Sequence, residues 1–110
     1  MVGSPVVRGD VFLVALDPTE GREIRKTRPC VIVSPDELNH HLATFIIAPL
    51  TTGSHPYPFR VPCRVGGKAG HVVLDQLRAV DRGRLGRRIT RLAPATLATV
   101  LTVLQEMFAP

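Results

Sequence analysis

Aromatic residues are scarce in this chain of 110 residues, which has no tryptophan, one tyrosine and four phenylalanines. Aliphatic side chains therefore supply most of its 45% hydrophobic content. That content is enough to bury a core within one domain of this length. We expect a single domain over residues 1–110, with an aliphatic core and with residues 1–7 as a loose lead-in.

Cysteine is also rare, and long apolar runs are absent. Two cysteines, Cys30 and Cys63, are too few for a disulfide framework, and Cys30 lies in the apolar run CVIV, where a small core residue is expected. The sequence has no stretch of about 18 apolar residues and no signal-peptide pattern. We therefore expect a soluble, cytoplasmic protein that does not enter a membrane.

The usual signals for a metal or a nucleotide cofactor are missing. His40 and His41 are adjacent, so on a strand they would point to opposite faces, and no carboxylate or cysteine stands at a ligand spacing. No glycine-rich phosphate loop follows a strand, and no G-x-S-x-G motif is present. The sequence thus predicts no metal site and no cofactor.

Acidic residues are outnumbered by basic ones, 9 to 14, and the formal net charge is +5. Twelve of the basic residues are arginine, the side chain that makes bidentate contacts with phosphate. A basic surface on a small domain indicates a nucleic acid or an acidic protein as partner. A GC-rich genome would give the same composition without any function, and composition alone leaves both explanations open.

Short apolar or alternating runs between turn residues predict a mainly β fold. The predicted strands cover residues 10–16, 28–34, 43–51, 59–65, 70–81 (a pair, or one long bent strand) and 83–92 (a short hairpin or a twisted edge strand). Gly66-Gly67 predicts a tight turn, residues 36–42 a turn or a single helical turn, and residues 20–27 and 53–58 exposed loops.

The last predicted element is an amphipathic helix. From Pro94 to residue 108 the apolar residues recur at helical spacing, and proline suits the first turn of a helix. Five to seven short strands with a closing helix indicate a small β-barrel or a sheet packed on a helix.

Three segments place polar side chains at strand ends. Arg28 precedes a proline, which favours an extended backbone and would hold its fork of donors at a strand entrance. Thr51 and Thr52 end an apolar run, where two hydroxyls can hold a phosphate oxygen or simply terminate a strand. Asp75 follows the apolar run VVL, and the simplest interpretation is a salt bridge to one of the arginines.

A basic segment, DRGRLGRRITR (81–91), carries five arginines. It is either a solvated face or an electrostatic track for phosphates, which would add affinity rather than sequence choice.

In this order, the segments resemble the MazF/PemK (Kid) toxins of toxin–antitoxin systems over residues 8–108. The resemblance rests on RGDVFLVALDPTEGREIRKTRPCVIVSP, APLTTGSHPYPFRV and GHVVLDQLRAVD. It implies an SH3-like barrel of five to seven strands with a C-terminal helix, usually a homodimer. It also implies an endoribonuclease that cuts single-stranded RNA at short sequences without a metal and so stops translation. An antitoxin with an acidic segment would block the site.

The resemblance also implies roles for individual residues. Arg28 and Thr51 match the family's catalytic arginine and threonine, and Glu23 matches a loop glutamate tied to activity. Asp75 matches an aspartate used in the Kid branch, whose arginine two positions earlier is Val73 here. The remaining residues expected to bind RNA are Arg22, Arg25, Lys26, Thr52, Ser54, Tyr57, Asp75 and Gln76.

These roles fit the chemistry implied by the family, in which a 2′-hydroxyl attacks the adjacent phosphate and leaves a 2′,3′-cyclic phosphate and a 5′-hydroxyl. The reaction develops extra negative charge on phosphorus. Arg28 can meet that charge with two donors and Thr51 with a third, and one such donor contributes about 2.7–4 kcal/mol of transition-state stabilisation. The proton acceptor stays open between Glu23, Asp75 and a phosphate oxygen.

Two alternatives come from other functional classes. A CcdB-like toxin would bind DNA gyrase without cutting anything, but the chain lacks a tryptophan near its C-terminus. A non-catalytic SH3-like nucleic-acid-binding module would share the charge but would not need Arg28 and Thr51 together.

Overall fold

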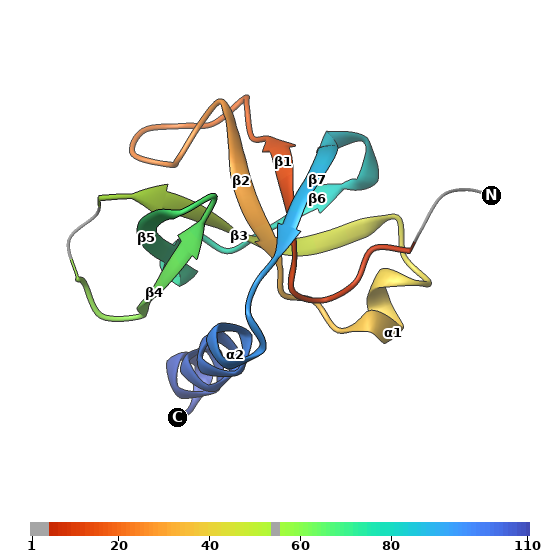
Figure 1. The fold of residues 1–110 in the computed structure, drawn as a ribbon. Helices are drawn as coiled ribbons and strands as arrows, with labels where there is room; N and C mark the ends of the chain where they lie inside the picture. The colour runs from red at the N-terminus through yellow and green to blue at the C-terminus, as the bar shows by residue number, and fades with distance from the viewer. Residues whose placement is uncertain (1–4, 54–55) are drawn as a thin grey trace.

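The computed structural model describes residues 5–53 and 56–110, which form seven β-strands, a short helix and a C-terminal helix (Figure 1). The strands are β1 (Asp10–Ala15), β2 (Thr27–Ile32), β3 (Thr44–Thr52), β4 (Arg60–Val65), β5 (Lys68–Val73), β6 (Arg78–Asp81) and β7 (Leu85–Arg91). The helices are α1 (Asp36–Asn39) and α2 (Pro94–Phe108), and the 3-10 turns are η1 (Leu74–Gln76) and η2 (Arg82–Arg84).

The strands pair antiparallel in the order β4-β5-β3-β2-β1-β7, with β6 also pairing with β3. The predicted fold class, mainly β with a C-terminal helix, is confirmed. Across the described residues the hydrogen-bonded path ends at β4 and at β7, so the small barrel stays open between these two strands.

The long strand β3 joins the two halves of the sheet. Its first residues pair with β6, its middle pairs with β2, and its last three residues pair with β5. The run 70–81, predicted as a strand pair or one bent strand, forms β5 and β6 with η1 between them, and both strands pair with β3. The prediction of a twisted edge strand is confirmed by β7, whose register against β1 is irregular.

Aliphatic side chains form two core clusters, as the composition predicted. Cys30 is fully buried in one of them, which confirms its interpretation as a core residue. Val100 of helix α2 is buried in the other, where Leu97, Leu104 and Met107 pack at its margin. None of the described helices is both long and apolar enough to span a membrane.

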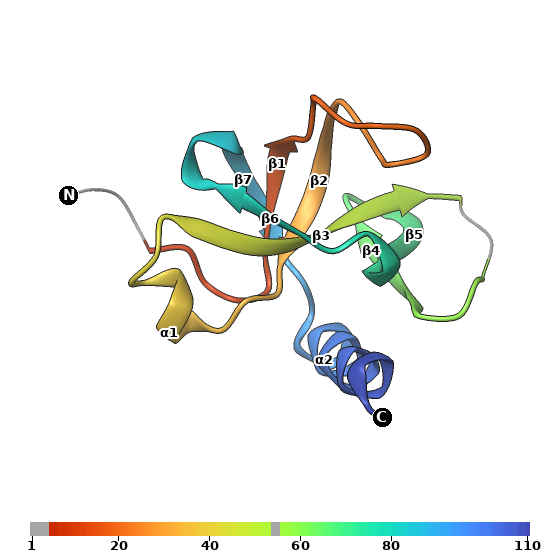
Figure 2. The ribbon, with the colours of Figure 1, turned by 180° about the vertical axis from the view of Figure 1, so that it is seen from behind.

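Two segments that are far apart in the sequence extend to the same side of the molecule. The loop between β1 and β2 and the hairpin of β4 and β5 lie on that side in both views (Figures 1 and 2). The hairpin turns at Gly66 and Gly67, whose φ angles of +59° and +79° suit a tight two-residue turn. The predicted turn is thereby confirmed, and the two segments border the candidate site.

Candidate active site

The site opens where β2 and β3 part. Their pairing ends at Cys30 opposite Pro49, and the same register continued by two residues would bring Arg28 opposite Thr51. Pro29 and Pro49 both lack an N–H at this point, so the hydrogen-bonded ladder loses its donors and the strands separate. The two predicted catalytic residues both line this opening.

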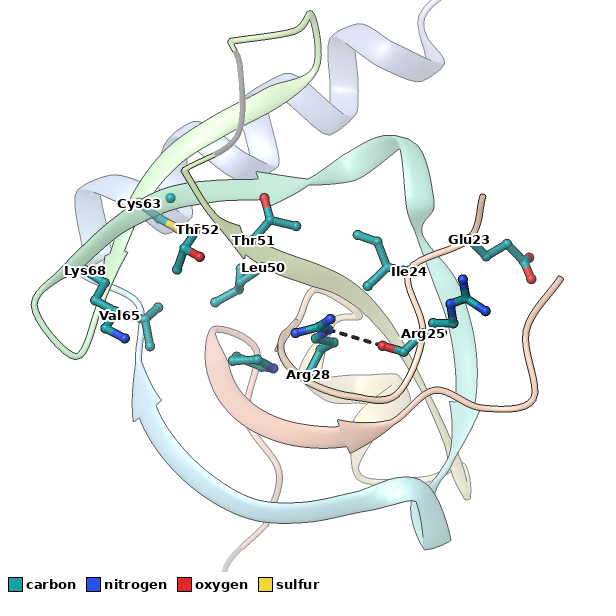
Figure 3. Close-up of a pocket in the computed structure, with 12 residues that line it drawn as sticks. Glu23, Ile24, Arg25, Arg28, Leu50, Thr51, Thr52, Cys63, Val65 and Lys68 are labelled. Carbon is teal, nitrogen blue, oxygen red and sulfur yellow. Dashed lines mark hydrogen bonds between the residues drawn. The ribbon is translucent and has the colours of Figure 1, made fainter. Parts of the chain in front are cut away.

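A cavity of about 630 Å³ lies in this opening (Figure 3). The loop after β1, the entrance of β2, the end of β3 and the β4–β5 hairpin all contribute to it. Its lining residues are Glu23, Ile24, Arg25, Arg28, Pro29, Leu50, Thr51, Thr52, Cys63, Val65, Lys68 and Gly70.

Arg28 occupies the centre of the cavity (Figure 3). Its Nε donates to the carbonyl oxygen of Arg25 at 3.2 Å, which fixes one edge of the guanidinium. Within residues 5–53 and 56–110, no carboxylate lies within salt-bridge distance of Arg28. The terminal nitrogens are thus available as two parallel donors for an anion.

Thr51 lines the cavity, but its hydroxyl is buried and has no hydrogen-bond partner in the described part of the chain. The hydroxyl points away from Arg28 (Figure 3). A change of χ1 rotamer would turn the hydroxyl to another staggered position about Cβ, and so offers a route into the cavity. Gly70 presses against this part of β3: a Cβ there would lie 1.9 Å from the Thr51 carbonyl oxygen.

Glu23 lies at the rim, and its carboxylate points away from Arg28 (Figure 3). It accepts a hydrogen bond from the backbone N–H of Glu20 at 2.6 Å, which closes a small turn in the loop. Of the residues that line the cavity, Glu23 is the acidic one, and Arg25 and Lys68 join Arg28 as cations. The excess of positive charge suits a phosphate.

Asp75 and Tyr57 lie outside the cavity lining and both contact Arg60. Asp75 accepts two hydrogen bonds of 3.1 Å from the Arg60 guanidinium, which confirms the predicted salt bridge. These bonds lower the pKa of Asp75 and raise that of Arg60. The guanidinium also lies 4.9 Å from the centre of the Tyr57 ring.

Gln76 is likewise outside the lining, but it contacts the loop that forms one wall. Its side-chain oxygen accepts a hydrogen bond from the backbone N–H of Ile24 at 2.7 Å. Arg22 and Lys26, from the same loop, do not line the cavity, whereas Arg25 and Thr52 do. Ser54 lies outside the described residues.

Sequence reasoning missed the wall formed by the β4–β5 hairpin, above all Lys68, Cys63 and Val65. The turn at residues 66–67 was predictable, but the pairing of β5 with the end of β3 was not. Burial raises the pKa of the Cys63 thiol, and it raises that of Cys30 to about 12, so neither thiol suits nucleophilic chemistry.

The arginines of segment 81–91 lie away from the cavity, and four of the five have contacts within the chain. Arg88 and Arg91 each donate from Nε to a carboxylate oxygen of Asp10 at 3.1 Å. Arg84 donates to the carbonyl oxygens of Ala15 and Asp17, and Arg82 lies over a phenylalanine ring. These contacts join β7 and η2 to the rest of the sheet.

Among the described residues, no three histidine, cysteine, aspartate or glutamate side chains converge as a metal site would require.

Comparison with known proteins agrees with this geometry. A sequence model of the family described as "PemK-like, MazF-like toxin of type II toxin-antitoxin system" matches residues 7–108. The chain belongs to this family. The resemblance seen in the sequence is confirmed, and with it the expectation that this PemK/MazF toxin is an endoribonuclease.

Three individual matches show how far the similarity of this PemK/MazF toxin extends. The endoribonuclease PemK of Escherichia coli is 35% identical over 104 residues, 89% of this chain and 78% of the relative. The crystal structure of MazF from Deinococcus radiodurans matches with a TM-score of 0.83 at 25% identity, over 96% of this chain and 97% of that one. A mycobacterial endoribonuclease in complex with its cognate antitoxin matches with a TM-score of 0.79 at 25% identity, over 94% of this chain and 96% of that one.

Proposed function

We propose that this toxin cuts single-stranded RNA at short sequences, without a metal ion, and thereby inhibits translation. The observation that carries the proposal is the Arg28 guanidinium, which lies in a basic cavity and has no carboxylate of the described residues within salt-bridge distance. A phosphate with developing negative charge is the group that this arrangement suits.

In the proposed reaction the 2′-hydroxyl of a nucleotide loses its proton and its oxygen bonds to the adjacent phosphorus. The bond from phosphorus to the 5′-oxygen breaks, and that oxygen takes up a proton from water. Arg28 stabilises the charge on the phosphoryl oxygens, and the hydroxyl of Thr51 adds a hydrogen bond after its rotamer changes. The products are a 2′,3′-cyclic phosphate and a 5′-hydroxyl.

Glu23 is the proton acceptor that the geometry favours. Asp75 is held by Arg60 outside the lining, and its lowered pKa makes it a weaker base. Glu23 lines the cavity, and its carboxylate would reach a substrate once it leaves the amide of Glu20.

We also propose a homodimer and regulation by an antitoxin with an acidic segment. Helix α2 leaves Phe108 70% exposed near its C-terminal end, and cover by a second copy would remove this large apolar side chain from water. A mycobacterial structural relative was solved with its cognate antitoxin, and the basic cavity of this chain would attract acidic side chains. A monomer mass in light scattering at micromolar concentration would contradict the dimer.

The test of the proposed function is cleavage of long single-stranded RNAs in excess EDTA, followed by analysis of the fragment ends. Cyclic phosphate and 5′-hydroxyl ends in EDTA are expected. If the folded protein cuts no RNA, the proposal fails, and binding to DNA gyrase and passive nucleic-acid binding are tested next.

A further inference from the structure

Two neighbouring side chains of the η1 turn bind the segments that flank the candidate site. Asp75 binds Arg60 at the start of β4, and Gln76 binds the backbone of Ile24 in the β1–β2 loop. The turn itself is anchored, because Leu74 is fully buried in the core. A rigid point thus lies behind the loop that forms one wall of the cavity.

The contact of Gln76 is linked to Arg28 through two consecutive residues. Ile24 donates its N–H to the Gln76 side chain, and the carbonyl oxygen of the next residue, Arg25, accepts the hydrogen bond from Arg28 Nε. The side chain of Ile24 also packs against a core cluster, and the base of the loop is held where Leu16 N–H donates to the carbonyl oxygen of Lys26 at 3.0 Å and Arg84 donates to that of Asp17. Gln76 adds the side-chain acceptor that holds the backbone at Ile24, next to the carbonyl oxygen on which Arg28 rests.

We propose that Gln76 is a positioning residue, which sets the orientation of Arg28 by holding the Ile24–Arg25 segment. The inference rests on the proposed function for its effect on catalysis. It departs from the expectation that Gln76 binds RNA, because the side chain uses its acceptor oxygen on the protein backbone. A displacement of a catalytic group by 1 Å can cost about 100-fold in rate, so the loss of this contact is expected to slow cleavage measurably.

The test compares two substitutions that separate the acceptor oxygen from the amide nitrogen. Gln76→Glu keeps an acceptor for Ile24, whereas Gln76→Met has similar length and none. Gln105→Met, on the exposed face of helix α2, is the matched control. For each variant, melting temperature, amide hydrogen exchange at Ile24, and kcat and KM for RNA cleavage are measured.

We expect Gln76→Met to speed exchange at Ile24 at least about tenfold and to lower kcat about tenfold, with KM within about threefold. Gln76→Glu should restore both protection and kcat, and Gln105→Met should change neither. Equal losses in the Glu and Met variants, confined to KM with Ile24 protected, would overturn the proposal and show that Gln76 contacts RNA. Unchanged exchange in Gln76→Met would also overturn it. Exchange is measured without RNA, so this result stands even if the proposed ribonuclease activity fails.

Discussion

The cavity and the β7 side of the sheet use arginine in opposite ways. On β7, Arg88 and Arg91 both bind Asp10, whose side chain is only 2% exposed. Arg28 has a single hydrogen bond to a backbone carbonyl and, among the described residues, no acidic partner, and the buried Thr51 hydroxyl has no hydrogen-bond partner among them either.

The difference shows where polar groups serve the fold and where they are available for chemistry. Native chains satisfy nearly all buried polar groups, so an unpartnered hydroxyl and an unpaired guanidinium that line one cavity indicate a candidate site.

Loss of Arg28 should have the largest effect on activity. Arg28→Ala is expected to lower kcat about 100- to 1000-fold, because two charge-assisted donors to the phosphate disappear. The melting temperature should change little, since the structure shows no acidic partner of Arg28 among residues 5–53 and 56–110 that the substitution would leave unpaired. Arg28→Lys keeps the charge but loses the fork, and an intermediate rate is expected in single-turnover cleavage. A full rate with lysine would contradict a bidentate role.

Removal of the Thr51 hydroxyl should move activity and stability in different directions. Thr51→Val keeps the shape of the side chain and is expected to lower kcat about 10- to 100-fold, less than loss of Arg28, because a neutral hydroxyl donates a weaker hydrogen bond. The free energy of unfolding should stay the same or rise, by up to about 1–3 kcal/mol, because a buried unpartnered hydroxyl is removed. Urea denaturation checks the second expectation. Thr51→Ser serves as the control that keeps the hydroxyl, and a destabilised Thr51→Val would mean that the hydroxyl has a structural role.

Asp10 should matter for stability and not for catalysis. Asp10→Asn weakens the contacts to Arg88 and Arg91 and is expected to lower the free energy of unfolding by about 1–3 kcal/mol. Cleavage per folded molecule, measured at low temperature, should equal that of the parent chain. Lost cleavage with unchanged melting would place this cluster in the functional machinery instead.

The Arg60–Asp75 pair should give the smallest effect, and one that depends on pH. The hydrogen bonds from Arg60 lower the pKa of Asp75, so its contribution is complete above the ordinary pKa of 3.8 and is lost as the pH falls through the lower value of the folded state. Asp75→Asn is expected to cost at most about 1 kcal/mol at neutral pH, because the pair is partly exposed. Urea denaturation over a pH series should show the difference from the parent chain vanish in acid. A difference that persists in acid would assign it to another cause.

Much of this arrangement was predictable from local sequence signals. An arginine held extended before Pro29, and two threonines at the end of an apolar run, were expected at strand ends, and the family resemblance gave Arg28 and Thr51 their roles. That Arg28 and Thr51 line the same cavity depends on the register of β2 against β3 and on the prolines that end this pairing. Such a register is a property of the assembled sheet.

The partners of Gln76 and the contribution of Lys68 could not be predicted. A polar residue at a strand end can face a substrate or another loop, and only the fold decides between them. Gln76 meets Ile24 across 52 positions, and Lys68 enters the cavity because β5 pairs with the end of β3. Neither contact leaves a periodic or compositional signal.

The most direct test of the contrast compares Arg28→Ala with Arg88→Ala in single-turnover cleavage of RNA in EDTA, with both proteins shown to be folded. Each substitution removes one arginine and the same charge. The account predicts a rate at least about 100-fold lower for Arg28→Ala and a rate within about threefold of the parent chain for Arg88→Ala. Equal rates for the two variants would show that net charge alone supports the reaction, and would contradict a specific role for Arg28.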